Sequence, residues 1–535
     1  LVKIGRAAAN SKDSDIILTG ILPTIRKFDL DEDNITPIPR YFALSEAIEK
    51  MRGQSYELKL RGIDELILKE DTTLLEASNT GFQVHFQVHP SQFVSKYNLA
   101  QAIAGPALAP GVNSPLLFGK RLWHETRIAL FQQSIDTRKS GEHIRESSPR
   151  VTFGKGWLDD SILEIYREDI ARFKVLISNE IEEDALSSLE QGIIPGLRAL
   201  QVHNGTVYRW NRPCYGVVDN VPHLRIENRV LPAGPSVIDE MANAALWLGC
   251  MNRLDDIYPN INKTMSFDVA SENFMSACRA GLSTAFTWLD GKKYDAPDLI
   301  KNELIPIAKE GLQNANINPD DISKYLDVME ERVSKRQTGS QWIIDSIAKM
   351  LPNHNREEII PSLTSAIIER QKDNIPVHKW ELASVADLSD WDVSNILVEE
   401  CMSTDLFTAT ENDIVGWAAG VMDWRNIRYM PVEDNDHHLL GLLTAKQILK
   451  YFVNASKMDK AKGRPVKKIM IKKTITIRPG ASIVDAMNLM QKHEIGCLPV
   501  VKNKKLVGIL TEQDFLRISA RLVKRFIRAK DLGLI

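Results

Sequence analysis

The chain is poor in cysteine, with five residues among 535. Their number is odd, they lie far apart, and no two of them form a CxxC pair. This pattern excludes a disulfide framework and favours buried free thiols in a reducing compartment. The five residues are Cys214, Cys250, Cys278, Cys401 and Cys497.

Long apolar runs and an excess of either charge are also missing. No stretch approaches the roughly 18 to 20 apolar residues that cross a membrane, and no signal-peptide pattern is present. The 67 basic and 70 acidic residues leave a net charge of -3, so no overall field attracts nucleic acid or an anionic membrane. We therefore expect a cytoplasmic protein without nucleic-acid or membrane partners. Any phosphate chemistry would depend on a local group of residues rather than on the net charge of the chain.

The length and balance of the chain are typical of a multidomain globular protein. At about 150 residues per domain, the chain predicts three or four units. Hydrophobic residues make up 44% and charged residues 26%, which disfavours disorder. The first residue is Leu1 rather than methionine, and LVKIGRAAANSK resembles the second half of an amphipathic helix. These features predict that the native protein begins upstream of Leu1.

A repeat occupies residues 395–452 and 464–520. At an offset of about 68 residues, Met402 aligns with Met470 and Pro431 with Pro499. A short strand and a turn follow each proline, and then comes GLLTAKQIL or GILTEQDFL. Each repeat predicts strand, helix, strand, strand, helix. One such unit leaves a face of its sheet uncovered, so the two repeats are expected to pack together.

The repeats resemble the CBS family over nearly their whole length. In that family the Thr after the final strand contacts a ligand phosphate, and an Asp three residues later accepts hydrogen bonds from both ribose hydroxyls. Thr511 and Asp514 keep this pattern, whereas Thr444 of the first repeat is followed by Gln447. The resemblance implies one competent site for AMP, ADP or ATP, and a homodimer through the CBS pair. The alternative is that the modules only join two copies and bind nothing.

Two segments nearer the N-terminus alternate strictly between apolar and functional side chains. GFQVHFQVH, residues 81–89, places Gln83, His85 and Gln87 on one side, and HLRIENRVL, residues 223–231, does the same for Arg225, Glu227 and Arg229. Gln, His and Arg-x-Glu-x-Arg are residues that coordinate metals or hold phosphates and carboxylates. We expect two strands that line a site; a merely solvated sheet face is the alternative.

Other segments complete the prediction for the N-terminal part. ELKLRGIDELIL from Glu57 alternates as a strand would, and TVYRWNRPCYG from Thr206 predicts another strand. LFGKRLWHETRIALFQQS from Leu117 predicts a helix that brings His124 and Arg127 onto neighbouring positions. Residues 235–385 are mostly helical by periodicity, most clearly over 301–351. RQTGSQW from Arg336 predicts a loop over the site.

In this part the sequence resembles the carboxylate-amine ligases similar to glutamate-cysteine ligase. The motifs that carry the resemblance run in order from about residue 16 to residue 385. They are ILPTIRKFDL, EASNTGFQVHFQVHP, GVNSPLLFGKRLWHETR, HNGTVYRWNRPCYG and PHLRIENRVLPAG. The resemblance implies an α+β fold, a glutamine-synthetase-like antiparallel sheet with helices on one side, over residues 1–388. An α/β CBS pair over 393–520 and a tail over 521–535 complete the expected organisation.

The resemblance also implies the reaction. A carboxylate, typically the side chain of glutamate, attacks the γ-phosphate of ATP, and an amine then displaces phosphate from the acyl phosphate. The substrates would be a small amino acid and an amine, and the cofactors ATP and Mg²⁺. His85 and Glu227 match metal positions of the family, with Gln83 or Gln87 close by. Arg225 and Arg229 would hold phosphate or the substrate carboxylate, and Asn113 and Arg127 would contact substrate.

One motif of the family has no counterpart in this sequence. Such ligases carry a Glu-x-Glu pair on their first strand, and no such strand precedes Ile16. We expect this strand upstream of Leu1. The rival hypothesis is an inactive ligase-like scaffold that senses adenine nucleotides. No residue identifies which carboxylate and which amine would be joined.

Overall fold

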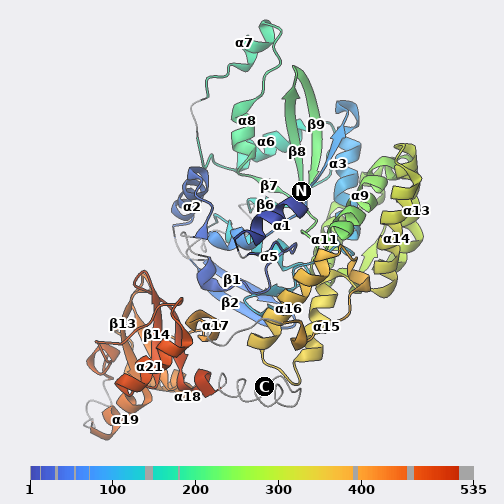
Figure 1. The fold of residues 1–535 in the computed structure, drawn as a ribbon. Coiled ribbons are helices and arrows are strands. Elements are labelled where there is room, and N and C mark those ends of the chain that lie inside the picture. Colours follow the sequence, from blue (N-terminus) through green and yellow to red (C-terminus); the bar gives the residue numbers. More distant parts are fainter. Residues whose placement is uncertain are drawn as a thin grey trace. The chain divides into compact units, whose positions relative to one another are not determined.

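A computed structural model of the chain divides into two compact units, residues 1–388 and 389–535, and each is described by itself (Figure 1). The structure describes residues 2–12, 14–30, 34–53, 56–70, 73–138, 149–178, 181–388, 396–454 and 463–516. The end of the second repeat, 517–520, and the expected tail, 521–535, lie outside these residues. Within the described part, none of the helices has the length and apolarity that crossing a membrane requires.

The first unit is built on a three-stranded antiparallel sheet in the order β3-β9-β8. Its strands are β3 (Val84–Val88), β8 (Asn211–Val218) and β9 (Val221–Asn228). The last two form a long hairpin, in which Asp219 and Asn220 both adopt positive φ angles, 50° and 58°. Asp and Asn tolerate this conformation, which matches the twist of paired strands. The alternating segments at 81–89 and 223–231 therefore pair directly with each other, as the patterns predicted.

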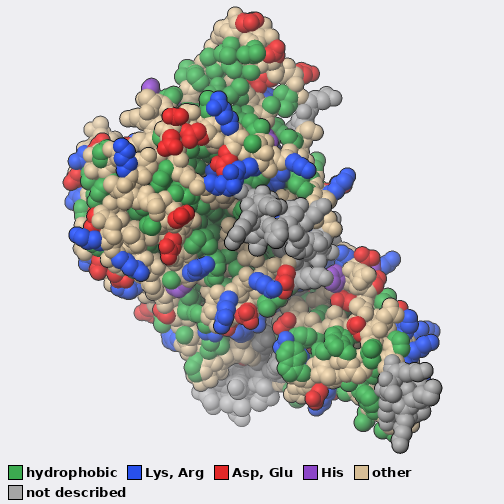
Figure 2. Space-filling view, turned by 180° about the vertical axis from the view of Figure 1, so that it is seen from behind, with side chains coloured by type: hydrophobic (Ala, Val, Ile, Leu, Met, Phe, Trp, Pro, Cys, Tyr) green, Lys and Arg blue, Asp and Glu red, His purple; other side chains and the backbone are tan. Residues whose placement is uncertain are grey.

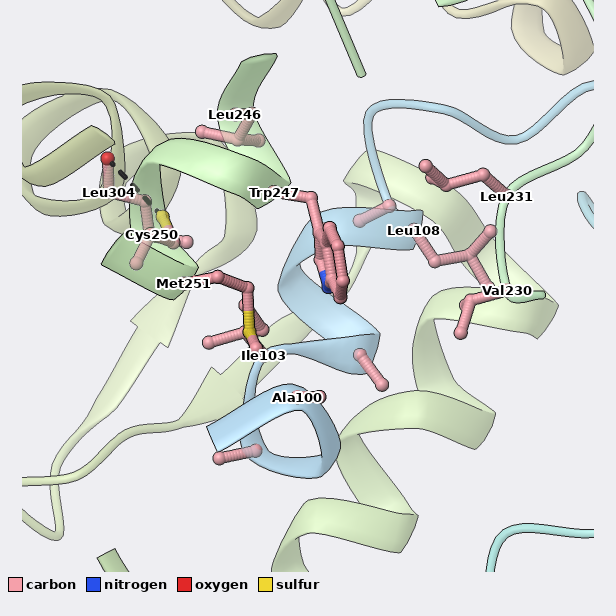
Figure 3. Packing of buried hydrophobic residues seen from close by; sticks show 14 of the residues in the cluster. Ala100, Ile103, Leu108, Val230, Leu231, Leu246, Trp247, Cys250, Met251 and Leu304 are labelled. Carbon is pink, nitrogen blue, oxygen red and sulfur yellow. Dashed lines mark hydrogen bonds between the residues drawn. The ribbon is translucent and has the colours of Figure 1, made fainter. Parts of the chain in front are cut away.

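Helices cover the apolar face of this sheet. They are chiefly α3 (Phe93–Ala102) and α9 (Val237–Ile257), and the ring of Phe86 meets the edge of Trp247 with 6.2 Å between centroids. Figure 3 shows Trp247 packed among side chains such as Ile103, Leu108 and Met251. Fully buried aromatic and aliphatic side chains of this size make up most of the hydrophobic stabilisation. The expected α+β fold, with helices on one side of an antiparallel sheet, is confirmed.

A second layer of helices packs behind α9. It contains α4 (Ala104–Leu108), α11 (Phe267–Ala280), α13 (Ile305–Asn314) and α14 (Pro319–Lys335). Helices α9 and α13 approach through glycines: a Cβ added at Gly249 would lie 2.3 Å from the carbonyl oxygen of Ala308. Only a residue without a side chain permits backbones to come this close. The predicted helical character of residues 235–385 is confirmed, apart from the short strands β10 (Ala285–Thr287) and β11 (Lys293–Asp295).

The remaining elements of the first unit surround this core. The helices are α1 (Val2–Asn10), α2 (Pro39–Arg52), α5 (Thr126–Ser134), α6 (Leu163–Arg172), α7 (Ala185–Glu190), α8 (Arg198–Asn204), α10 (Ile261–Thr264), α12 (Ala296–Leu299), α15 (Gly339–Met350) and α16 (Arg356–Lys372). The strands are β1 (Tyr56–Arg61), β2 (Glu65–Glu70), β4 (Leu116–Leu117), β5 (Lys120–Arg121), β6 (Val151–Thr152) and β7 (Tyr208–Arg209).

Three local predictions were wrong. The segment from Glu57 forms the β1–β2 hairpin rather than one strand, because the chain reverses at Gly62, where a Cβ would lie 2.3 Å from a carbonyl oxygen. The helix predicted from Leu117 begins at Thr126, since Phe118 and Gly119 form a turn with positive φ angles. Only residues 336–338 of RQTGSQW form a turn, between α14 and α15, and its last four residues begin α15, so the segment is not a loop.

The second unit contains two matching hairpins. They are β12 (Tyr429–Glu433) with β13 (Leu439–Thr444), and β14 (Cys497–Lys502) with β15 (Lys505–Thr511). The described helices are α17 (Val398–Cys401), α18 (Val415–Trp424), α19 (Ala445–Asn454) and α21 (Ile483–His493). Bridges pair Ser403 with Ile509 and Leu442 with Ile471, so each repeat adds a residue to the other's sheet. The two repeats pack together as predicted.

Candidate functional site

The face of β3-β9-β8 that points away from the helices is densely polar. One row across the sheet consists of His85, Glu227 and Arg212, and the next row on the same face of Gln87, Arg225 and Cys214. Residues directly opposite one another, and those two positions further along, share a face. The register therefore gathers groups from segments more than 100 residues apart.

Glu227 is the centre of this face. Its Oε1 accepts a hydrogen bond from Nε of Arg229 at 2.8 Å, and its Oε2 accepts one from Sγ of Cys214 at 3.2 Å. Nη1 of Arg212 lies 3.7 Å from Oε2. Burial alone would raise the pKa of Glu227, but the Arg229 charge, the Cys214 hydrogen bond and Arg212 together hold it below its ordinary value. The carboxylate is therefore ionised at neutral pH.

The groups around Glu227 are mainly cationic or neutral. Burial, followed by the charges of Arg225 and Arg229, lowers the pKa of His85 against the opposing pull of Glu227, so its imidazole is neutral at pH 7. Within the described residues, Nε of Arg212, Nε of Arg225 and Nδ1 of His223 are buried without a hydrogen-bond partner. Three guanidinium groups beside one carboxylate favour the binding of an anion.

Glu76 is a second carboxylate beside this face. It lies in a short 3₁₀ helix, Leu74–Ser78. Burial raises its pKa to about 7, and the charge of Arg229 offsets only part of this rise. A carboxyl group with such a pKa exchanges a proton near neutral pH, a property common at functional sites. The EASNT stretch that precedes β3 gave no sign of this role, because burial is decided by the fold.

Asn113 and Arg127 lie outside the three strands of this face, and both are hydrogen-bonded within the protein. The Arg127 side chain is bonded to Glu125 at 3.2 Å, to the carbonyl of Arg229 at 3.3 Å and to that of Val230. Asn113 donates through Nδ2 to the carbonyl of Ala233 at 2.7 Å. Both residues are buried and fix the segment that follows β9. His124 precedes α5, so it does not share a helix with Arg127 as the sequence predicted.

The strand register also identifies residues that the sequence prediction missed. Ligand atoms of His85, Cys214 and Glu227 all lie within 4.8 Å of one another. Gln87 shares the face, and Gln83 directly precedes β3. All five cysteines are free; Cys214 and Cys401 are half-buried and the others buried. The alternation of Arg212 and Cys214 in NRPCYG was the available signal, but it required knowledge of the strand's partner.

In the second unit the two repeats present similar turns. The hydroxyl and the backbone N–H of Thr511 both donate to Oδ2 of Asp514, at 2.7 and 2.8 Å, and Asp514 is buried. In the first repeat, Oε1 of Gln447 accepts from the N–H of Thr444 at 3.1 Å and also from its hydroxyl. Gln447 thus reproduces the local hydrogen bonds of Asp514 without its charge. Only the second repeat offers a carboxylate at this position.

Related proteins share parts of this chain. An uncharacterized protein of Methanocaldococcus jannaschii, MJ1404, is 27% identical over 252 residues, which cover 39% of this chain and 60% of the relative. Homoserine O-acetyltransferase of Methanohalobium evestigatum is 31% identical over 127 residues, 24% of each chain. The chain therefore spans 60% of the first relative and about a quarter of the second.

Solved structures also match about a quarter of the chain. The CBS domain pair of protein MJ0100, in complex with 5'-methylthioadenosine and S-adenosyl-L-methionine, is 27% identical and covers 23% of this chain and 95% of that one, with a TM-score of 0.21. CBSX2 in complex with AMP is 23% identical and covers 24% and 98%, with a TM-score of 0.22. At these TM-scores the structures add nothing to the assignment of the chain.

Two family models assign both parts of the chain. The CBS domain model matches residues 398–454 and 466–521. The model of glutamate-cysteine ligase family 2 (GCS2) matches residues 6–365, well over half of the chain, and this range includes the whole polar face. The chain therefore belongs to glutamate-cysteine ligase family 2 and carries a tandem pair of CBS domains after its ligase-family domain.

Proposed function

We propose that the first unit is an ATP-dependent carboxylate-amine ligase that forms an amide through an acyl phosphate. The observation that carries the proposal is the polar face of β3-β9-β8, where Arg212, Arg225 and Arg229 surround the ionised Glu227. Membership of a ligase family supports the reaction class. The reaction of a carboxylate with ATP brings two anions together, and their repulsion must be compensated. A site rich in fixed cations provides this compensation.

We assign the arginines of the polar face to the binding of phosphate and of the substrate carboxylate. Arg225 lies in the middle strand with an unpartnered Nε, so it can receive a phosphate or a substrate carboxylate without losing an internal bond. Arg229 is already held by Glu227 and is positioned beside it. Planar guanidinium groups bind carboxylates and phosphates through two parallel hydrogen bonds. Asn113 and Arg127 position the chain that follows β9, and their contact with substrate stays a prediction.

The donor set of this face is compatible with magnesium that arrives with the nucleotide. Mg²⁺ is usually held by one or two carboxylates together with phosphates and waters. Glu227 offers the carboxylate and His85 faces it, while Gln83 and Gln87 are adjacent in sequence. Three guanidinium groups disfavour the free dication but favour its complex with ATP. When bound, the metal would neutralise charge on the phosphate oxygens.

We further propose that the CBS pair senses adenine nucleotides. Asp514 would accept hydrogen bonds from the ribose hydroxyls and Thr511 would donate to a phosphate; Thr444 would serve only a weaker first site, because Gln447 lacks the charge. A carboxylate accepts from a diol, whereas an amide has a single oxygen for this purpose. Regulation requires only that the nucleotide bind two states of the protein unequally. Association of two copies through this pair is part of the same proposal.

The rival function, an inactive ligase-like scaffold that senses nucleotides, is favoured by one observation. On the polar face, within the described strands, Glu227 is the only carboxylate, and both of its oxygens are already engaged. A ligase needs enough negative charge to hold its magnesium. The two functions differ in whether any substrate pair stimulates the release of ADP.

The test is a screen of ADP release by the full-length native protein with MgATP and pairs of amino acids and amines. Stimulation by one pair, lost in Glu227→Gln and kept in the exposed control Glu272→Gln, would establish the ligase. If no pair stimulates release, or if Glu227→Gln keeps full activity, the ligase assignment to this face is wrong.

A further inference from the structure

An ion pair joins the two CBS repeats beside the nucleotide site proposed for the second repeat. Arg428, the residue before β12, donates through Nη1 to Oε1 of Glu512 at 3.0 Å. Glu512 directly follows Thr511, the proposed phosphate contact, and its backbone N–H donates to the carbonyl of Gly496 at 3.1 Å. The first repeat therefore places a guanidinium group at the edge of the second repeat's site.

The first repeat has no counterpart of this ion pair. Its Ala445 occupies the position of Glu512, and the N–H of Ala445 donates to the carbonyl of Arg428 at 2.9 Å, as the equivalent backbone groups do in the second repeat. The position of Arg428 is taken in the second repeat by Gly496. Neither Ala445 nor Gly496 has a charged side chain, so the ion pair occurs only beside the repeat that carries Asp514.

Close packing holds Glu512 at this corner. A Cβ added at Gly496 would collide with the hydroxyl of Tyr429 and would lie 3.2 Å from Oε2 of Glu512. Burial, followed by the charge of Glu512, raises the pKa of the Tyr429 phenol. A residue without a side chain at position 496 therefore gives the phenol and the carboxylate room to lie beside the site.

A phosphate that reaches Thr511 enters a corner that already contains two carboxylates. Asp514 and Glu512 repel such a dianion unless a cation compensates their charge, and Arg428 supplies that cation. The side chains of Arg428 and Glu512 are 66% and 47% exposed, and exposed ion pairs contribute little to stability. Because guanidinium groups bind phosphate through two parallel hydrogen bonds, a phosphate can displace Glu512 from Arg428.

We propose that Arg428 binds the phosphate of a nucleotide held by the second repeat, and that Glu512 is an internal competitor for this arginine. The proposal rests on the nucleotide site proposed above for Thr511 and Asp514. Without nucleotide, Glu512 accepts the hydrogen bond of Arg428; with AMP, the phosphate accepts it instead. The free and bound states then differ by one contact between the repeats, and such a difference is what regulation by a nucleotide requires.

Two substitutions break the same ion pair but should have opposite effects on AMP binding. Arg428→Gln removes the cation, so it should weaken AMP binding at least tenfold. Glu512→Gln removes the competitor and its negative charge, so it should strengthen AMP binding at least threefold. If the ion pair only held the repeats together, both variants would change the affinity in the same direction. Isothermal titration calorimetry of AMP into the full-length protein measures these affinities.

Adenosine and a matched arginine are the controls. Adenosine has the ribose but no phosphate, so Arg428→Gln and Glu512→Gln should bind it with the affinity of the wild type. Arg425→Gln removes another exposed arginine of the same repeat, one that stacks on the rings of Phe407 and Trp424, and should leave AMP affinity unchanged. An equal loss of AMP and adenosine affinity in Arg428→Gln, or weaker AMP binding in Glu512→Gln, would overturn the proposal.

Asp514→Ala distinguishes the ribose contact from the phosphate contact. It should weaken the binding of AMP and of adenosine alike, whereas Arg428→Gln should weaken the binding of AMP alone. A wild type that binds neither ligand would refute both the nucleotide site and the role of Arg428. A wild type that binds AMP with an affinity unaffected by Arg428→Gln and Glu512→Gln would leave the nucleotide site in place and refute only the competition.

Discussion

The raised pKa of Glu76 gives a direct prediction about stability. A group whose pKa is higher in the folded protein favours folding while it is protonated. The contribution of Glu76 is therefore complete below its ordinary pKa of 4.5 and is lost as the pH rises towards about 7. A rise in pKa of this size changes the free energy of unfolding by at most about 3 kcal/mol. Glu76 is only half-buried, so screening by solvent reduces the expectation to about 1 to 2 kcal/mol.

The perturbation is Glu76→Gln, which keeps the shape of the side chain and is neutral at every pH. At pH 4.5 the variant should match the wild type in the Tm of the first unit, and above pH 7 it should be more stable. Differential scanning calorimetry at a series of pH values measures the difference. Glu272→Gln, on the exposed side of α11, is the control and should show no such trend. A difference between Glu76→Gln and the wild type that stays constant with pH would refute the reasoning.

Three further predictions concern other parts of the molecule. Glu227→Gln removes the charge that pairs with Arg229, so it should lower the free energy of unfolding by about 1 to 3 kcal/mol at pH 7. Because the pKa of Glu227 is lowered in the fold, this loss of stability should shrink as the pH falls below 4.5. A loss that grows in acid would contradict the prediction. Asp514→Ala should weaken AMP binding at least tenfold in calorimetry on the full chain, and unchanged affinity would refute the ribose assignment. Gly249→Ala should lower the Tm by an amount equivalent to about 1 to 3 kcal/mol, because the added methyl meets the backbone of α13, whereas Gly416→Ala, also helical but with open space around it, should not.

The surface fits the balanced charge of the chain. Over the face seen in Figure 2, basic and acidic side chains are interspersed among polar and apolar ones. Neither sign covers a large continuous area, as expected from 67 basic and 70 acidic residues. The cationic character of the candidate site is thus local, and it arises from the register of three strands rather than from the composition of the chain.

Close approaches of backbone in the CBS pair explain part of the repeated sequence. A Cβ added at Gly508 would lie 2.4 Å from Sδ of Met402, and one added at Gly441 would lie 2.7 Å from the carbonyl oxygen of Ile471 and 2.9 Å from Sδ of Met470. Each repeat's methionine therefore packs on the glycine of the other repeat. The aligned Met and Gly positions were visible in the sequence, but the exchange between repeats was not.

The sequence by itself determined the features that depend on local periodicity. Strict alternation in GFQVHFQVH and HLRIENRVL fixed which side chains share a face, because successive residues of a strand point to opposite sides. The internal repeat fixed the CBS pair and its unequal Thr511–Asp514 and Thr444–Gln447 turns. Local pattern failed where one residue changes the path of the chain, as at Gly62 and Phe118.

The tertiary structure alone decided which strands are neighbours and which groups are buried. The order β3-β9-β8 brought Cys214 beside His85 and Glu227, although it is 129 residues from the first and 13 from the second in sequence. Burial beside the sheet raised the pKa of Glu76. Strand pairing and desolvation both depend on contacts between distant segments, and no periodicity within one segment encodes them.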